Sequence, residues 1–117
     1  MITDSLEQLR QRLAEFAVAR DWEQFHSPKN LAMALIAETA ELVEIFQWLT
    51  EEQSRCLSTT KKQAVSHELA DILIYLIRIA DKLDIDLIAA AQIKIQINEN
   101  RYPVERVKGD ARRADEY

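Results

Sequence analysis

The chain contains 117 residues, of which 48% are apolar and 30% are charged, and its formal net charge is −5. This balance is typical of one globular domain with a single core, and it excludes an intrinsically disordered chain. A negative net charge argues against binding of nucleic-acid polymers, which needs a basic surface, but it is compatible with one small anion held through a metal or a local basic cluster. The single Gly and two Pro residues favour long helices with few turns.

A first helix is predicted over about 3–20, where apolar residues recur with a spacing of three and four. Ser5 and Gln8 near its start are typical of a capping box, in which each side chain accepts a hydrogen bond from the other residue's backbone. An aromatic-rich connection follows this helix. The N-terminal segment lacks a basic flank beside an apolar run, so we expect no signal peptide.

A second helix is predicted over about 28–49. Ser27 is a suitable N-cap, and Pro28 fits the first turn because its missing N–H has no partner to lose there. The polar segment 50–60 is predicted to be a mobile loop. It contains the lone Cys56, which excludes a disulfide framework and fits the reducing cytoplasm.

A third helix is predicted over about 61–83 and a fourth over about 87–98, with Asp86 as its N-cap. The stretch QIKIQIN at 92–98 alternates like a strand, but a lone strand would have no partner, so we expect helix. The tail 105–117 is mostly charged and is predicted to be irregular.

Four long helices with short links predict an all-α fold, a four-helix bundle formed by a single domain over 1–117. The third helix is apolar around nearly its whole circumference, which is typical of a helix buried on all sides. Its apolar residues are Leu69, Ile72, Leu73, Ile74, Leu76, Ile77 and Ile79. Because a small bundle cannot surround one helix completely, we expect another subunit to cover part of the third helix and the Ile93 and Ile97 side of the fourth. No segment approaches the roughly 18 consecutive apolar residues of a membrane span.

Two acidic residues of the second helix lie where apolar residues are expected. A turn of about 100° per residue places Glu38 in the middle of the apolar stripe and Glu41 at its edge, about 60° away. Glu44 lies about 120° from Glu38 and is expected at the rim. The residues within about 40° of Glu38 are Leu31, Ala34, Leu42, Ile45 and Leu49.

The third helix repeats this pattern with Glu68 and Asp71, which are three residues apart and therefore share one face. If the two helices pack antiparallel, four carboxylates can converge, and they then need protonation, salt bridges or a divalent cation. Arg78 is the one base inside these helices and lies on another face. All-oxygen ligation is typical of Mg²⁺, Mn²⁺ or Ca²⁺. We favour Mg²⁺, with Mn²⁺ possible; the alternative is that these acids are ordinary surface residues.

The two acid pairs lie in three stretches that together resemble a known family. These stretches are EFAVARDWEQFHSPKNLAMALIAETAELVEIFQWL, ELADILIYLI and KIQINENRYPV, which span roughly residues 15–104. They resemble the MazG-like all-α nucleoside triphosphate pyrophosphohydrolases, and most closely their dCTP pyrophosphatase branch. The resemblance implies hydrolysis of a nucleoside triphosphate to the monophosphate and pyrophosphate, as nucleotide-pool house-cleaning, by a homotetramer built from paired dimers.

The resemblance also implies the site residues. Mg²⁺ would be held by Glu38, Glu41, Glu68 and Asp71. Apart from the resemblance, Glu41 is the candidate base that activates water, because it lies at the edge of the apolar stripe. The base pocket would use Trp22, Phe25, His26, Trp48 and Tyr75. The phosphate side would use Lys94, Asn98, Arg101 and Tyr102. At Leu13 some relatives carry His, which leaves the preferred base open.

The residues by themselves allow other interpretations. Lys94, Asn98 and Arg101 share a helix face that would suit a polyphosphate, but a solvated helix end has the same composition. Without the resemblance, Trp22, Phe25 and Trp48 are more typical of a core than of a base-binding surface. A non-catalytic helical oligomer that binds nucleotides or metal, and a structural bundle that binds another protein, are the alternative functions.

Overall fold

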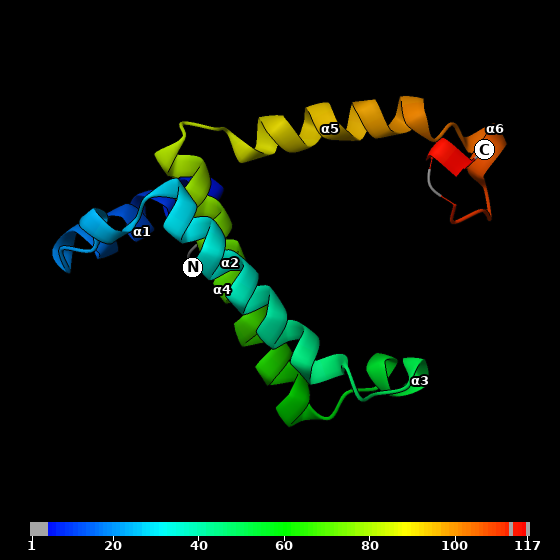
Figure 1. Ribbon diagram of the computed structural model, residues 1–117, viewed down its shortest axis with the longest axis horizontal. Coiled ribbons are helices and arrows are strands. Elements are labelled where there is room, and N and C mark those ends of the chain that lie inside the picture. Colours follow the sequence, from blue (N-terminus) through cyan, green and yellow to red (C-terminus); the bar gives the residue numbers. More distant parts are fainter. Residues whose placement is uncertain (1–4, 113, 117) are drawn as a thin grey trace. The chain divides into compact units, whose positions relative to one another are not determined.

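The computed structural model describes residues 5–112 and 114–116, and within them every regular element is a helix (Figure 1). The fold is therefore all-α, as predicted. Internal contacts divide the chain into two compact units, one up to Asp84 and one from Ile85 onward. The single domain and the four-helix packing stay predictions. In the described residues, no helix is both long enough and apolar enough to cross a membrane.

The first unit consists of three long helices and two short ones. They are α1 (Leu6–Ala19), the 3₁₀ turn η1 (Glu23–Phe25), α2 (Pro28–Phe46), α3 (Glu51–Arg55) and α4 (Thr59–Lys82). Helices α2 and α4 run antiparallel and side by side, and α1 packs against α4 (Figure 1). The antiparallel packing that the acid pairs require is therefore present.

The predicted N-caps of the first two helices are confirmed. The Ser5 hydroxyl accepts a hydrogen bond from Gln8 N at 3.2 Å, and the Gln8 side chain accepts one from Ser5 N at 2.9 Å. The Ser27 hydroxyl accepts a hydrogen bond from Asn30 N at 3.1 Å, with Pro28 in the first turn. Both caps satisfy backbone N–H groups that have no partner inside a helix.

Helix α1 ends in a left-handed turn at Asp21, whose φ is 55°. Trp22 N donates to Ala17 O at 2.9 Å and Asp21 N donates to Val18 O at 3.0 Å, the pattern of a Schellman cap. Aspartate tolerates this backbone conformation better than most residues. The turn sets the position at which Trp22 and the η1 segment leave the helix.

The mobile loop predicted over 50–60 is wrong in part, because residues Glu51–Arg55 form helix α3. Thr50 and Gln53 cap its start reciprocally, and Glu51 and Glu52 lie in the first turn, where negative charge is favourable. A helix of five residues is too short to leave a periodic apolar signal. Helix α2 ends at Phe46, three residues before the predicted end, because Gln47–Leu49 form a turn.

The second unit contains α5 (Leu87–Arg101), α6 (Val104–Val107) and the 3₁₀ turn η2 (Ala114–Glu116). Asp86 caps α5 as predicted, accepting from Ala89 N at 3.0 Å, and the QIKIQIN stretch is helical. Helix α5 extends three residues beyond the predicted end. The tail predicted to be irregular contains η2 and most of α6, and Gly109 adopts a φ of 80° just after α6. Residues 113 and 117 of that tail lie outside the described residues.

The fully buried apolar set is small for a chain of this size. Among the described residues it consists of Ala17, Leu31, Ile77 and Ala80. Other large apolar side chains of α4 remain exposed, among them Leu69, Leu73 and Leu76. Within the first unit, the apolar residues of the predicted third helix are therefore only partly covered.

Candidate active site

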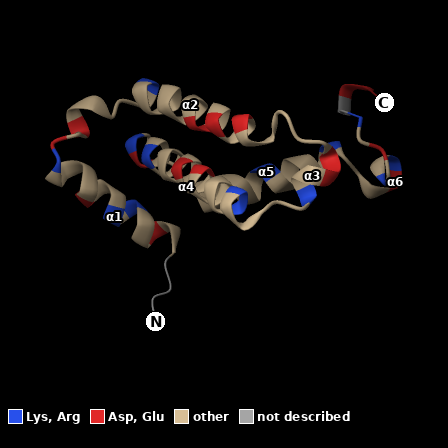
Figure 2. Ribbon diagram, turned by 90° about the horizontal axis from the view of Figure 1, so that it is seen from below, with Lys and Arg blue, Asp and Glu red and all other residues tan. Residues whose placement is uncertain are grey.

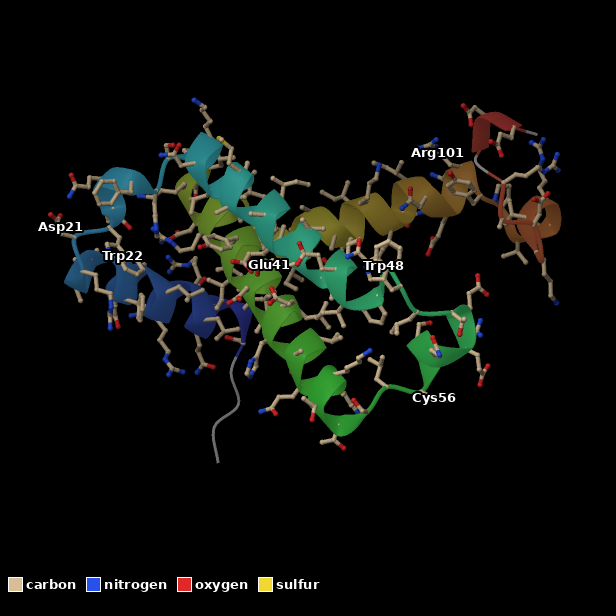
Figure 3. All side chains as sticks on the ribbon, turned by 60° about the horizontal axis from the view of Figure 1, so that its bottom comes forward. Asp21, Trp22, Glu41, Trp48, Cys56 and Arg101 are labelled. Carbon is tan, nitrogen blue, oxygen red and sulfur yellow. The ribbon has the colours of Figure 1, made fainter. Side chains whose placement is uncertain are left out.

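Three carboxylates converge between α2 and α4. One carboxylate oxygen from each of Glu38, Glu41 and Glu68 lies within 4.8 Å of the other two. Glu38 and Glu41 share a face of α2 because they are three residues apart, and the antiparallel neighbour α4 brings Glu68 to them. Figure 2 shows acidic positions on both helices, and Figure 3 shows Glu41 where α2 runs alongside α4.

Two of these carboxylates have an oxygen without a partner. Oε2 of Glu38 and Oε2 of Glu68 are buried and accept no hydrogen bond. Burial, together with the neighbouring carboxyls, raises the pKa of Glu38 to about 7. Burial also raises the pKa of Glu68 above its ordinary value. Buried polar atoms in proteins are normally paired, so these two oxygens require a ligand or a proton.

Asp71, the fourth predicted acid, is half-buried on α4 and lies outside the cluster of three oxygens. Its charge nevertheless contributes to the raised pKa values of Glu38 and Glu68. Glu44 is exposed and also lies outside the cluster, as expected for a rim residue.

Basic side chains do not neutralise the cluster. Within the described residues, no Lys or Arg forms an ion pair with Glu38, Glu41, Glu68 or Asp71. Arg78 is paired elsewhere, with Glu23 and Asp81. A donor set of oxygens only, with two buried and unpartnered, fits a hard divalent cation such as Mg²⁺ or Mn²⁺.

The predicted base-pocket residues gather around two separate places. Trp22 and His26 flank η1, with ring centroids 6.2 Å apart, and Phe25 is exposed beside them. Trp48 follows the other end of α2 and is 86% exposed. Helix α2 has 19 residues and is therefore about 28 Å long, so Trp22 and Trp48 of one chain cannot contact one base (Figure 3). Tyr75 is half-buried on α4.

The predicted phosphate-side residues belong to the second unit. Lys94 and Asn98 are exposed on α5, Arg101 is its last residue and Tyr102 its C-cap. The guanidinium carbon of Arg101 lies 5.6 Å from the Tyr102 ring centroid, at cation–π distance. The spacing of Lys94, Asn98 and Arg101 places them on one face of α5.

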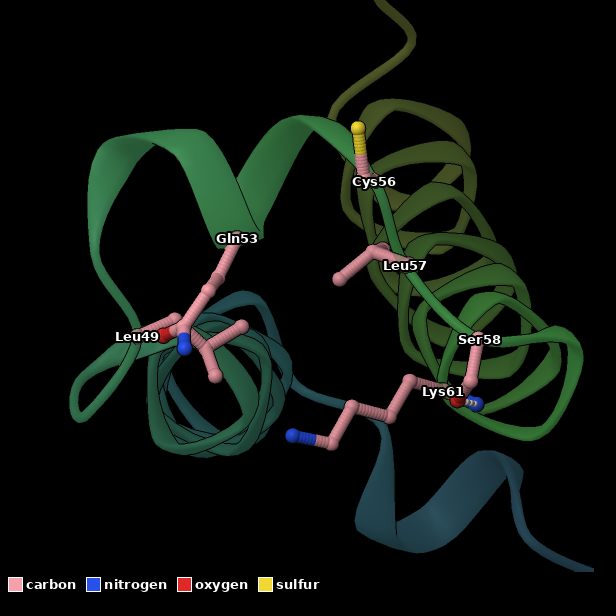
Figure 4. A pocket seen from close by; sticks show the side chains of 6 residues that line it. All are labelled: Leu49, Gln53, Cys56, Leu57, Ser58 and Lys61. Atoms are coloured by element: carbon pink, nitrogen blue, oxygen red, sulfur yellow. Dashed lines mark hydrogen bonds between the residues drawn. The ribbon is translucent and has the colours of Figure 1, made fainter.

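A pocket of about 230 Å³ lies between the end of α2 and the start of α4 (Figure 4). It is lined by Leu49, Gln53, Cys56, Leu57, Ser58 and Lys61. None of the predicted site residues lines it. Cys56 is exposed there, and its thiol lies 4.0 Å from Oε1 of Glu52.

The ion pairs of Arg78 with Glu23 and Asp81 were not predicted from the sequence. Arg78 is buried, with an exposed fraction of 3%, and its guanidinium reaches the η1 segment from α4. A lone Arg inside the apolar run ILIYLIRIA is the one feature of the sequence that indicates a buried, paired charge at this position.

The MazG-like family matches residues 34–116, which include both acid pairs and most of the chain. The chain belongs to the MazG-like family. The resemblance drawn from the acid pairs and the flanking stretches is thus confirmed. This MazG-like chain is 45% identical over 109 residues to dCTP pyrophosphatase 1 of Bos taurus, an alignment that covers 92% of this chain and 64% of the relative. It is 42% identical over 114 residues to dCTP pyrophosphatase 1 of Homo sapiens, covering 96% of this chain and 67% of that protein.

The chain therefore spans about two thirds of the length of the curated relatives that it matches. A solved structure shares its MazG-like all-α fold. A pyrophosphatase from Archaeoglobus fulgidus DSM 4304 superposes with a TM-score of 0.80 at 38% identity, covering 88% of this chain and 99% of that chain.

Proposed function

We propose that this protein hydrolyses nucleoside triphosphates between the α and β phosphates, with dCTP or a modified deoxynucleotide as substrate. The observation that carries the proposal is the group of Glu38, Glu41 and Glu68, with two buried oxygens that lack partners. Relatives named dCTP pyrophosphatase 1 and a solved pyrophosphatase with the same fold support this choice.

Glu38, Glu41, Glu68 and Asp71 would hold Mg²⁺, with Mn²⁺ as an alternative. A bound divalent cation would neutralise charge on phosphate oxygens and favour ionisation of water. Glu38 and Glu68 contribute the buried oxygens. Glu41 is exposed beside them, so it can accept a proton from the attacking water while remaining open to solvent.

We propose that Lys94, Asn98, Arg101 and Tyr102 bind the phosphates, with Lys94 and Arg101 stabilising the leaving pyrophosphate. Their shared face on α5 and their positive charge support this role. Arg101 can contact two phosphate oxygens at once, whereas Lys94 supplies a single point charge.

Trp22, Phe25, His26, Trp48 and Tyr75 are the proposed base-binding residues. Because α2 separates Trp22 from Trp48 by about 28 Å, a pocket that contains both must draw them from two protomers. The exposed apolar face of α4 supports the same conclusion, and we propose a homotetramer built from paired dimers. The lone Cys56 is consistent with a cytoplasmic location.

The test is pyrophosphate release from a panel of deoxy- and ribonucleoside triphosphates, measured with Mg²⁺ and with EDTA. We expect release that requires Mg²⁺ and is fastest with dCTP or a 5-substituted dCTP. Glu38→Ala should lower the rate by more than the 10- to 100-fold typical of an outer-shell ligand partner. Glu44→Ala, on the same helix but outside the cluster, should keep the wild-type rate.

The alternative is a helical oligomer that binds nucleotide or metal without chemistry. A non-hydrolysable triphosphate would then bind in a calorimetric titration while the natural nucleotides release no pyrophosphate. Wild-type turnover by Glu38→Ala would contradict the assignment of the carboxylates.

A further inference from the structure

Arg78 is a buried charge that the proposed chemistry does not use. Its exposed fraction is 3%, and it lies on α4 near the η1 segment rather than beside the carboxylate cluster. A buried guanidinium is costly unless its N–H groups are paired. The groups that pair with it therefore indicate its role.

The guanidinium joins α4 to the segment that carries Trp22 and His26. Nη2 of Arg78 donates to Glu23 Oε1 at 2.5 Å, and Nη1 donates to Asp81 Oδ2 at 3.3 Å. Lys82 donates to the other oxygen of Glu23. Glu23 opens η1, so these contacts hold the turn at a fixed place against α4.

Arg78 also contacts His26 through one particular ring nitrogen. Nε and Nη2 of Arg78 lie 3.4 Å and 3.2 Å from Nδ1 of His26. An arginine has donors but no acceptor, so Nδ1 must carry a lone pair and the imidazole proton must lie on Nε2. Burial, and then the charge of Arg78, lower the pKa of His26, which keeps the ring neutral at pH 7.

The Nε2 proton is available to a ligand. Within residues 5–112 and 114–116, no hydrogen bond from Nε2 of His26 is formed, and the Trp22 ring lies next to the imidazole. An aromatic face beside one fixed donor is a common way to recognise a nucleobase by stacking and by a hydrogen bond to its edge. A cytosine offers acceptors at O2 and N3 to such a donor.

We infer that Arg78 is a positioning residue for base recognition: it ties the turn to α4 and fixes His26 as the Nε2–H tautomer, so that His26 donates to an acceptor atom of the base. The inference rests on the proposed function for its ligand, but the tautomer can be measured without any substrate.

The first test is a ¹⁵N NMR spectrum of histidine-labelled protein at pH 7. The chain has two histidines, so His67→Gln assigns the remaining ring signals to His26. We expect one neutral tautomer with the proton on Nε2 in the wild-type chain, and a rapidly exchanging pair of tautomers in Arg78→Lys. A proton on Nδ1, a charged ring, or a spectrum unchanged by Arg78→Lys would overturn the inference. Because this measurement needs no turnover, it stands even if the chain hydrolyses no nucleotide.

The second test compares steady-state kinetics of Arg78→Lys and the wild type with the four natural deoxynucleoside triphosphates. We expect KM for the preferred substrate to rise about tenfold, because the loss of one hydrogen bond weakens binding by about that factor. We expect kcat to stay within about twofold of the wild-type value. Discrimination among the four bases should fall by a similar factor.

Arg10→Lys is the matched control. Arg10 also binds Asp81, at 3.1 Å, but its hydrogen bonds reach neither His26 nor Glu23, so base discrimination should stay at the wild-type value. An equal fall in kcat for all four substrates in Arg78→Lys, with KM unchanged, would overturn a role in base positioning.

Discussion

At the scale of single residues, Glu38 shows how a carboxylate can be identified from its neighbours. Its place in the apolar stripe of α2 predicts a buried acid, and the structure places Oε2 of Glu38 out of contact with water and hydrogen-bond donors. Burial, with neighbouring acids, holds the pKa near 7, compared with an ordinary value of 4.5. The metal-free chain therefore keeps a proton on this site at mildly acidic pH.

This proton predicts how stability depends on pH. Since the pKa of Glu38 is higher in the folded chain than in the unfolded chain, the folded chain binds more protons between about pH 4.5 and 7. The contribution of Glu38 to the free energy of unfolding is fully present below about pH 4.5 and is lost as pH rises through about 7. Urea unfolding in EDTA, measured as the difference between wild type and Glu38→Gln across this range, checks the expectation.

Mg²⁺ should reverse the loss at pH 8, because its ligands bind in the deprotonated form. Glu44→Gln, whose side chain is exposed, should follow the wild-type curve. A wild-type chain that gains stability relative to Glu38→Gln as pH rises in EDTA would contradict the account.

At the scale of elements, α2 positions both halves of the candidate site. Its middle carries Glu38 and Glu41, and its two ends adjoin the segments with Trp22 and Trp48. Leu31 anchors the first part of the helix and is 2% exposed. Among the described residues, Leu31 is the one buried residue of α2.

Leu31→Ala should therefore lower the free energy of unfolding by about 2–5 kcal/mol, from lost burial and the cavity left behind. Leu31→Met conserves volume and should cost less than about 1.5 kcal/mol. Chemical denaturation of both variants gives the comparison. Equal losses in the two variants would show that the volume at this position does not matter.

At the scale of the whole molecule, we propose that the apolar surface of α4 is an interface between protomers. Leu73 is 40% exposed, and Leu69 and Leu76 on the same helix are also exposed. Apolar surface of this kind on a small chain is typical of an interface. The proposed base pocket, which contains both Trp22 and Trp48, gives an independent reason to propose a second protomer.

Leu73→Asp should weaken the oligomer, raising its dissociation constant at least tenfold by placing a charge in an apolar contact (about 1.4 kcal/mol or more). Light scattering coupled to size exclusion, over a dilution series, measures the change. Gln63→Asp adds the same charge to an exposed polar position of α4 and should leave the mass unchanged. A wild-type chain that elutes as a monomer at all concentrations would contradict the proposal.

Interactions between residues that are close together along the chain were predictable from the sequence. The caps at Ser5, Ser27 and Asp86 need only a side chain and a backbone N–H three residues later. The helical period places Glu38 among apolar residues, and the acid pairs with their flanking stretches indicate the MazG-like family. These features depend on local geometry, which the order of residues specifies directly.

Tertiary structure decided which distant side chains meet. It brings Glu68 to Glu38 and Glu41 while Asp71 stays outside that cluster, and it joins Glu23 to Arg78 across 55 positions of the chain. Such contacts depend on how whole helices pack, and many packings are compatible with one pattern of apolar residues. The sequence alone therefore determines the long helices and the acids they carry, whereas the packing of α1, η1 and α2 on α4 determines which of those side chains act together.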